Sequence, residues 1–155
     1  MRNSCANSRS ASEAVVLVDA NVLLYAVNDS MPQHASAKRW IEHALDGTEA
    51  VGFAWLVLLA FVRLATLRAL FPSPLDPGTA LDLVEDWLRA RPAIIVHPTA
   101  RHASVLRGLL AESGTAGNLV SDAHLAALCI EHGARICTFD RDFGRFRGVS
   151  AFEPA

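Results

Sequence analysis

Hydrophobic and polar positions along the chain form blocks that predict strands and helices in turn. Residues 15–18 are an unbroken aliphatic run, Val-Val-Leu-Val, which is typical of a strand covered on both faces. Residues 22–27 then carry hydrophobic side chains at helical spacing. Asp19 lies between the two blocks, where an open α/β sheet presents groups at the carboxyl ends of its strands. Asp19 is therefore the first candidate for chemistry.

The rest of the chain repeats this alternation. Short hydrophobic segments predict further strands, and longer periodic segments predict helices. The predicted strands are residues 50–54, 94–96, 135–138 and 149–152; the predicted helices are residues 34–45, 55–70, 79–88, 103–111 and 120–130, with a loop or short helix over 139–146. Thr79 is the expected N-cap of its helix, with Leu81 and Val84 facing inward. The pattern predicts an α/β sandwich with a central, mostly parallel sheet.

Length and composition indicate one domain. The 155 residues are 52% hydrophobic and 19% charged, with a net charge of -2, so no global basic field attracts nucleic acid. Residues 1–14 are polar and aperiodic and are expected to form a disordered tail, with the domain spanning 15–155. Arg63 and Arg68 interrupt the longest apolar stretch, so we expect no membrane span, and the absence of a signal-peptide pattern favours a cytoplasmic protein.

Acidic residues carry the candidate chemistry, because no pair of cysteines has metal-ligand spacing. Asp140 follows the predicted strand 135–138 as Asp19 follows the first strand. Asp142 is two residues beyond Asp140. Asp122 lies in the first turn of a predicted helix. Each could instead be a helix cap or a turn residue. Gathered at one edge, the carboxylates would raise each other's pKa unless a cation lay among them, and oxygen ligands suit Mg²⁺ or Mn²⁺.

Two motifs resemble those of PIN-domain ribonucleases, in particular the VapC toxins. The first is Val-Leu-Val-Asp19-Ala-Asn21-Val-Leu-Leu-Tyr-Ala; the second runs from Gly117 through Ser121-Asp122 and continues in Ile-Cys-Thr138-Phe-Asp140-Arg-Asp142-Phe. The resemblance extends from Val15 to about Phe152. It implies a Mg²⁺-dependent endoribonuclease toxin that hydrolyses RNA phosphodiesters, with Mn²⁺ as an alternative ion. It also implies a VapB-like antitoxin as partner and a homodimer.

The resemblance also implies roles for individual residues. Asp19, Asp122 and Asp140 would be the catalytic metal ligands, with Asp142 as a further candidate. The residues that would orient these carboxylates are Asn21, Ser121 and Thr138.

The chain departs from the family in the helix after the second strand. PIN domains usually carry a glutamate there, followed shortly by an arginine; here Arg63 is present, but Ala60 stands at the acidic position. The site could hold one ion, or recruit Asp142 or a distant glutamate such as Glu42 or Glu49. A catalytically weakened module that mainly binds antitoxin or RNA is the alternative interpretation.

Two arginines are candidates for contacts with RNA or antitoxin. Arg63 has apolar neighbours. Arg141 lies in a loop with further arginines and phenylalanines, and this loop either contacts RNA or is anchored to the core by its phenylalanines.

The six histidines are scattered, and the sequence assigns no chemistry to them. Phosphatases and receiver domains also place acids at a sheet edge, but Asn21 stands where a haloacid-dehalogenase-type phosphatase needs aspartate. A receiver needs a late lysine, and Lys38 is the only lysine.

Overall fold

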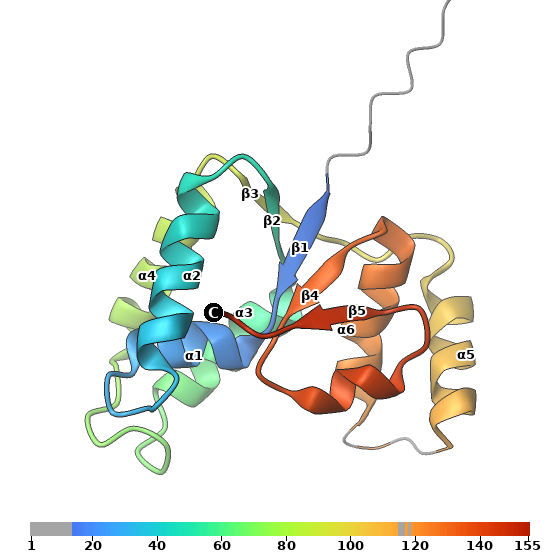
Figure 1. The fold of residues 1–155 in the computed structure, drawn as a ribbon. Coiled ribbons are helices and arrows are strands. Elements are labelled where there is room, and N and C mark those ends of the chain that lie inside the picture. Colours follow the sequence, from blue (N-terminus) through green and yellow to red (C-terminus); the bar gives the residue numbers. More distant parts are fainter. Residues whose placement is uncertain (1–13, 115–116, 118) are drawn as a thin grey trace, which may run out of the picture.

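The computed structural model describes residues 14–114, 117 and 119–155, and it contains a five-stranded sheet between helices (Figure 1). All neighbouring strands are parallel, in the order β3-β2-β1-β4-β5. The strands are β1 (Val15–Val18), β2 (Ala50–Phe53), β3 (Ala93–Ile95), β4 (Arg135–Cys137) and β5 (Ser150–Phe152). The predicted α/β class and central parallel sheet are confirmed. Residues 1–13 of the predicted tail lie outside the described residues.

Helices cover both faces of this sheet. Figure 1 shows the first four helices on one side and α5 and α6 on the other, and the close packing of α1 with α2 and α3, and of α5 with α6, agrees with this arrangement. The helices are α1 (Ala20–Val27), α2 (His34–Asp46), α3 (Trp55–Ala65), α4 (Pro77–Arg89), α5 (His102–Ser113) and α6 (Leu119–His132), followed by the 3₁₀ helix η1 (Arg141–Arg145).

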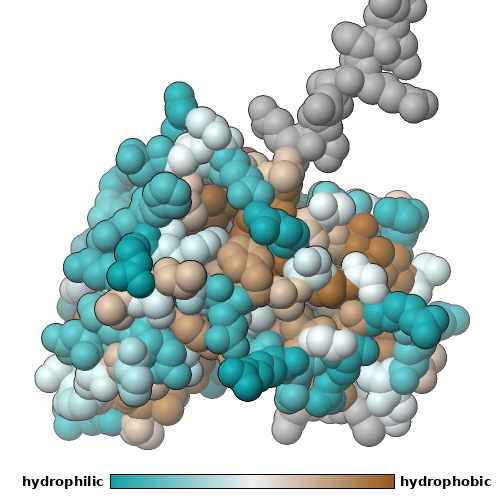
Figure 2. Space-filling model, viewed as in Figure 1, coloured by the Kyte–Doolittle hydropathy of each residue, from teal (hydrophilic) through white to brown (hydrophobic). Residues whose placement is uncertain are grey.

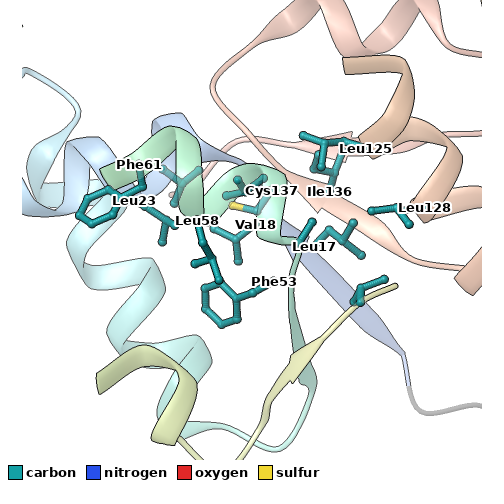
Figure 3. Close-up of a cluster of buried hydrophobic side chains, with 14 of the residues drawn as sticks. Leu17, Val18, Leu23, Phe53, Leu58, Phe61, Leu125, Leu128, Ile136 and Cys137 are labelled. Atoms are coloured by element: carbon teal, nitrogen blue, oxygen red, sulfur yellow. The ribbon is translucent and has the colours of Figure 1, made fainter. Parts of the chain in front are cut away.

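The core is built around β1, which lies in the middle of the sheet. Leu17 and Val18 are each 1% exposed, as expected for a strand with helices on both faces. Figure 3 shows these two side chains at the centre, with the α3 side chains Leu58 and Phe61 on one side and Leu125 and Leu128 of α6 on the other. Because both layers pack on β1, the residue that follows this strand is held in a fixed position.

Helix α3 is shorter than the sequence predicts. The hydrophobic pattern predicted a helix as far as Leu70, whereas α3 ends at Ala65. The Thr66 hydroxyl donates to the carbonyl oxygen of Val62 at 2.9 Å, and a hydroxyl bonded back to the preceding turn disturbs a helix. Leu70 is 51% exposed, so its helical spacing does not reflect burial.

Helix α4 also differs from the prediction at its start. Its N-cap is Asp76, not Thr79, because Asp76 Oδ1 accepts a hydrogen bond from the Thr79 backbone nitrogen at 3.1 Å. Pro77 then begins the helix, at a position where its missing N–H has no partner to lose. The expectation that Leu81 faces inward is wrong, since this residue is 47% exposed. The buried residues of the helix are Ala80, Val84 and Trp87.

The described residues also show the character of the surface and of two of the cysteines. None of the helices in the described residues is both long enough and apolar enough to cross a bilayer. Figure 2 shows hydrophobic surface mainly in the middle of one face, between α2 and α5, with hydrophilic residues along α2. Cys129 and Cys137 are buried and unpaired, and burial raises the pKa of the Cys129 thiol to about 12, so neither is a reactive thiolate.

Candidate functional site

Asp19 lies at the carboxyl end of β1 and is the N-cap of α1. Its Oδ1 accepts a hydrogen bond from the backbone nitrogen of Ala20 at 2.7 Å, and its Oδ2 accepts hydrogen bonds from Thr138 Oγ1 at 2.7 Å and Asn21 Nδ2 at 3.1 Å. The residue is only 9% exposed. Burial raises the pKa of Asp19, with a smaller contribution from the nearby Asp140, although the hydrogen bonds oppose the rise.

The buried Thr138 hydroxyl connects the end of β1 to the end of β4. It donates to Asp19 and accepts from Asn21 Nδ2 at 3.2 Å and from the backbone nitrogen of Asp140 at 2.9 Å. Asn21 completes the link, because its Oδ1 accepts a hydrogen bond from the backbone nitrogen of Phe139 at 3.1 Å. By donating one hydrogen bond and accepting two, the Thr138 hydroxyl makes all the hydrogen bonds that a hydroxyl can make. The two residues predicted to orient Asp19 therefore do contact it, and their catalytic role stays a prediction.

Asp122 lies in the first turn of α6 and is half-buried. Burial raises its pKa to about 6, and Asp19 and Asp140 contribute further to the rise. The guanidinium group of Arg145 opposes it. Carboxylates from β1, α6 and the segment after β4 therefore interact electrostatically, as the sequence interpretation requires. Ser121 is exposed beside Asp122 and makes no hydrogen bond to the described site acids.

Asp140 and Asp142 occupy the turn into η1. Asp140 is its N-cap, and its Oδ1 accepts a hydrogen bond from the backbone nitrogen of Asp142 at 2.8 Å. Asp142 is exposed and pairs with Arg145 at 3.4 Å. Both acids therefore have the structural roles that turn residues commonly play, in addition to their nearness to Asp122.

The donor set fits a hard divalent cation by its chemistry, since the acids supply only oxygen atoms and raise one another's pKa. The arrangement is not a finished metal site, however. Among the described residues, no three acidic, histidine or cysteine side chains are placed so that they could hold one ion together. Ion binding would have to draw the carboxylates closer together.

Within residues 14–114, 117 and 119–155, neither of the two proposed glutamates lies at the acidic position that the resemblance implies at Ala60. Glu49 pairs at 2.9 Å with Arg135, the first residue of β4, and therefore lies near the amino ends of the strands. Glu42 is an exposed residue of α2 and lies 4.0 Å from Lys38. Ala60 itself lines a recess that it shares with Asp19 and Asp122. Of the proposed substitutes, only Asp142 lies near the other acids.

The two candidate arginines differ in their surroundings. Arg63 lines the same recess as Asp19 and Asp122, and within the described part of the chain its guanidinium group makes no ion pair. Arg141 is exposed and pairs with Glu153 at 3.2 Å. Arg63 thus lies beside Asp19 and Asp122, whereas Arg141 lines a separate pocket with Thr138 and Asp140.

One cluster was missed by the sequence interpretation. Glu131 Oε2 lies 2.5 Å from His102 Nδ1, and His102 Nε2 lies 2.9 Å from His124 Nδ1. Glu131 Oε1 also accepts a hydrogen bond from the backbone nitrogen of Thr99 at 2.9 Å. These hydrogen bonds tie α5 and the segment before it to α6. The residues are 22 to 32 positions apart, so only helix packing could have indicated the cluster.

The chain matches the PIN domain family model over residues 16–149. It is 55% identical to ribonuclease VapC37 of Mycobacterium tuberculosis over 138 residues, which cover 89% of this chain and 96% of that protein. Its fold is similar to VapBC2 of Rickettsia felis bound to a DNA fragment from its promoter, with a TM-score of 0.65, 16% identity, and coverage of 91% and 99%. The fold is also similar to VapC20 of M. tuberculosis, a sarcin-ricin loop cleaving toxin, with a TM-score of 0.63, 18% identity, and coverage of 83% and 92%.

The raised pKa of Asp122 predicts how the stability of the metal-free protein depends on pH. The folded state holds this proton more tightly than the unfolded chain, so the stabilisation is complete below the ordinary pKa of 3.8 and is lost as the pH rises through about 6. In metal-free buffer at pH 7, Asp122→Asn should therefore raise the free energy of unfolding by about 1 kcal/mol. A shift of one pKa unit corresponds to about 1.4 kcal/mol, and solvent screening of this half-exposed group reduces the effect. Urea denaturation of the wild type and of Asp122→Asn at pH 4 and pH 7 measures both the pH dependence of stability and the effect of the substitution.

The control for this experiment is Asp82→Asn, which removes an exposed acid of α4 and should change neither value. An Asp122→Asn variant that is less stable than the wild type at pH 7 would contradict the idea that burial and the neighbouring acids disfavour the ionised carboxylate.

The histidine cluster predicts a second effect on stability. Burial favours the neutral form of Glu131, but hydrogen bonds from Thr99 and His102 outweigh this effect and hold its pKa below the usual value. The side chain is 0% exposed. Glu131→Gln should lower the free energy of unfolding at pH 7 by about 1.5–3 kcal/mol, the range for hydrogen bonds to a charged group. Chemical denaturation tests this, with Glu112→Gln on the exposed side of α5 as the control; equal stability of the two variants would refute it.

Proposed function

The chain belongs to the PIN-domain family, and we propose that it is a metal-dependent endoribonuclease toxin of the VapC type. The observation that supports this proposal is the electrostatic interaction of Asp19, Asp122 and Asp140, which come from three separate segments. The 55% identity to a VapC ribonuclease, over almost the full length of both chains, supports the same activity. We also propose a cytoplasmic location, where an RNA substrate would be found.

Asp19, Asp122 and Asp140 would hold the ion, with Asp142 as the fourth candidate. Mg²⁺ suits an all-oxygen donor set, and Mn²⁺ is the alternative. When bound, such an ion polarises the phosphodiester and lowers the pKa of the attacking water. Thr138 and Asn21 fix the Asp19 carboxylate so that its orientation does not depend on solvent. Arg63, in the same recess, is placed to bind a phosphate oxygen of the RNA.

The partners we propose are a VapB-like antitoxin and a second copy of the chain. Six of the eight exposed large hydrophobic side chains in the described residues lie between Trp55 and Leu81, on α3, the segment after it and α4. An apolar surface of this kind commonly marks a protein interface. The similarity of the fold to VapBC2 of R. felis supports the antitoxin as one occupant.

Ala60 favours a second candidate function, a weakened module that mainly binds antitoxin or RNA. The wall of the recess that would carry the family's glutamate is apolar here, and the described acids are not arranged as a finished metal site. Absence of Mn²⁺ binding in a calorimetric titration, together with retained antitoxin binding, would favour this alternative over the nuclease.

RNA cleavage in Mg²⁺ or Mn²⁺ is the direct test of the nuclease. Asp19→Asn and Asp122→Asn should each lower the cleavage rate by at least about 100-fold, the scale typical of losing a group that acts in the reaction. Asp82→Asn, outside the site, should cleave at the wild-type rate. Equal cleavage by the wild type and the two site variants would reject the assignment.

The hydroxyl that holds Asp19 predicts a smaller loss. Thr138→Val keeps the shape of the side chain but removes all three hydrogen bonds of the hydroxyl, so cleavage should fall by about 10–100-fold, as for other groups that orient metal ligands. Thr138→Ser keeps the hydroxyl and should recover most of the activity. A serine variant as impaired as the valine variant would show that packing, not the hydroxyl, matters.

A further inference from the structure

A second cavity, of about 320 Å³, lies at the amino ends of the strands, where the candidate site acids do not reach. Val16, Val51 and Arg135 are register partners on the neighbouring strands β1, β2 and β4, so their side chains project from the same face of the sheet. The second half of α2, the loop after it and Phe152 of β5 complete the walls. The volume is within the range of pockets that hold small ligands, and the proposed nuclease function makes no use of it.

Two aromatic rings from different elements form the apolar part of this cavity. Trp40 of α2 and Phe152 of β5 meet edge to face, with their ring centroids 6.0 Å apart. Both rings pack against the core and yet remain partly exposed. Aromatic rings that stay accessible in a concave site are surfaces on which a planar ligand can stack.

The polar part is built around the guanidinium group of Arg135. This group lies over the Phe152 ring, 4.8 Å from its centroid, and the stacking holds the plane of the guanidinium in place. Its Nη2 donates to Glu49 Oε1 at 2.9 Å, the one hydrogen bond that the group makes within the described part of the chain. Since a guanidinium group has five N–H donors, a second acceptor can bind beside Glu49 or in its place.

We propose that this cavity binds a planar heteroaromatic ligand that carries an anion, the chemistry of a nucleoside monophosphate. The ring lies against Trp40 and Phe152, and the anion accepts hydrogen bonds from Arg135, as the Glu49 carboxylate already does. Carboxylates and phosphates both match the fork of a guanidinium group. His43, exposed at the rim, is in reach of the same anion. The proposal does not depend on the nuclease function, because the two sites share no residue.

Glu49 makes the site one that a ligand enters by exchange. Its side chain is 43% exposed and belongs to the loop between α2 and β2, so it can turn into solvent when another anion takes its place. An ion pair with this exposure is weak, and little is lost when it opens. A phosphate carries more charge than a carboxylate and therefore competes well for the same guanidinium group.

Calorimetric titration of the metal-free protein with adenosine 5′-monophosphate (AMP) tests the site, with adenosine as the same ring without the anion. AMP should bind saturably and about tenfold more tightly than adenosine, the scale of a hydrogen bond to a charged group. Arg135→Gln should remove this difference and leave adenosine binding unchanged, whereas Trp40→Leu should weaken the binding of both ligands. Arg89→Gln is the matched control, since it removes an exposed, ion-paired arginine of α4 outside the cavity.

A gain of affinity separates the proposal from a general loss of structure. Glu49→Gln removes the carboxylate that competes for Arg135 and should tighten AMP binding by about threefold, which partial unfolding cannot produce. Absence of saturable AMP binding to the wild type overturns the proposal. AMP binding that neither Arg135→Gln nor Glu49→Gln changes places the nucleotide elsewhere on the molecule and overturns it as well. RNA cleavage is not measured, so a failure of the nuclease assignment does not affect this result.

Discussion

The hydroxyl of Thr138 is the interaction on which the candidate site depends. Asp19 and Asp140 are 121 residues apart, and they meet because β1 and β4 are parallel neighbours, with the Asp19 backbone nitrogen bonded to the Cys137 carbonyl oxygen at 3.0 Å. The Thr138 hydroxyl then bonds both the Asp19 carboxylate and the Asp140 backbone. A buried hydroxyl with all its bonds made leaves little freedom for either group. The sheet brings Asp19 and Asp140 together, and this hydroxyl fixes the Asp19 carboxylate and the Asp140 backbone.

Electrostatics at this edge oppose the stability of the metal-free protein. Asp19 is held in place by hydrogen bonds that favour its ionised form, yet burial still raises its pKa. Asp122 is less buried, but burial is still the largest cause of its raised pKa, and the charges of Asp19, Asp140 and Asp142 add to it. A cation among these carboxylates would remove the repulsion, so the same charges that destabilise the free protein favour an ion. Perturbed acids in one recess are typical of functional sites for this reason.

Local sequence patterns predicted those parts of the fold that local forces determine. The first strand, the acid after it and the following helix were predictable because a buried strand has a continuous apolar run and Asp19 is a good N-cap. The end of α3 was not, since Leu70 has helical spacing although it is exposed. The cluster of His102, His124 and Glu131 depends on how α5 packs against α6, and no spacing in the sequence encodes that packing. The nearness of Asp19 and Asp140 could be inferred because parallel neighbouring strands end at a common edge; their role as metal ligands stays a prediction.

Residue 60 stands where the resemblance implies a glutamate, and in this chain it is alanine. A glutamate there would add a carboxylate to a recess in which Asp122 already has a raised pKa, caused by burial and by the charges of the neighbouring acids. Alanine adds no charge, so the ionised form of Asp122 is opposed by fewer like charges than a glutamate would impose. An ion at this edge would in turn be held by fewer carboxylates. The same small side chain thus lowers the electrostatic cost of the metal-free protein and the number of ligands that the proposed site can offer.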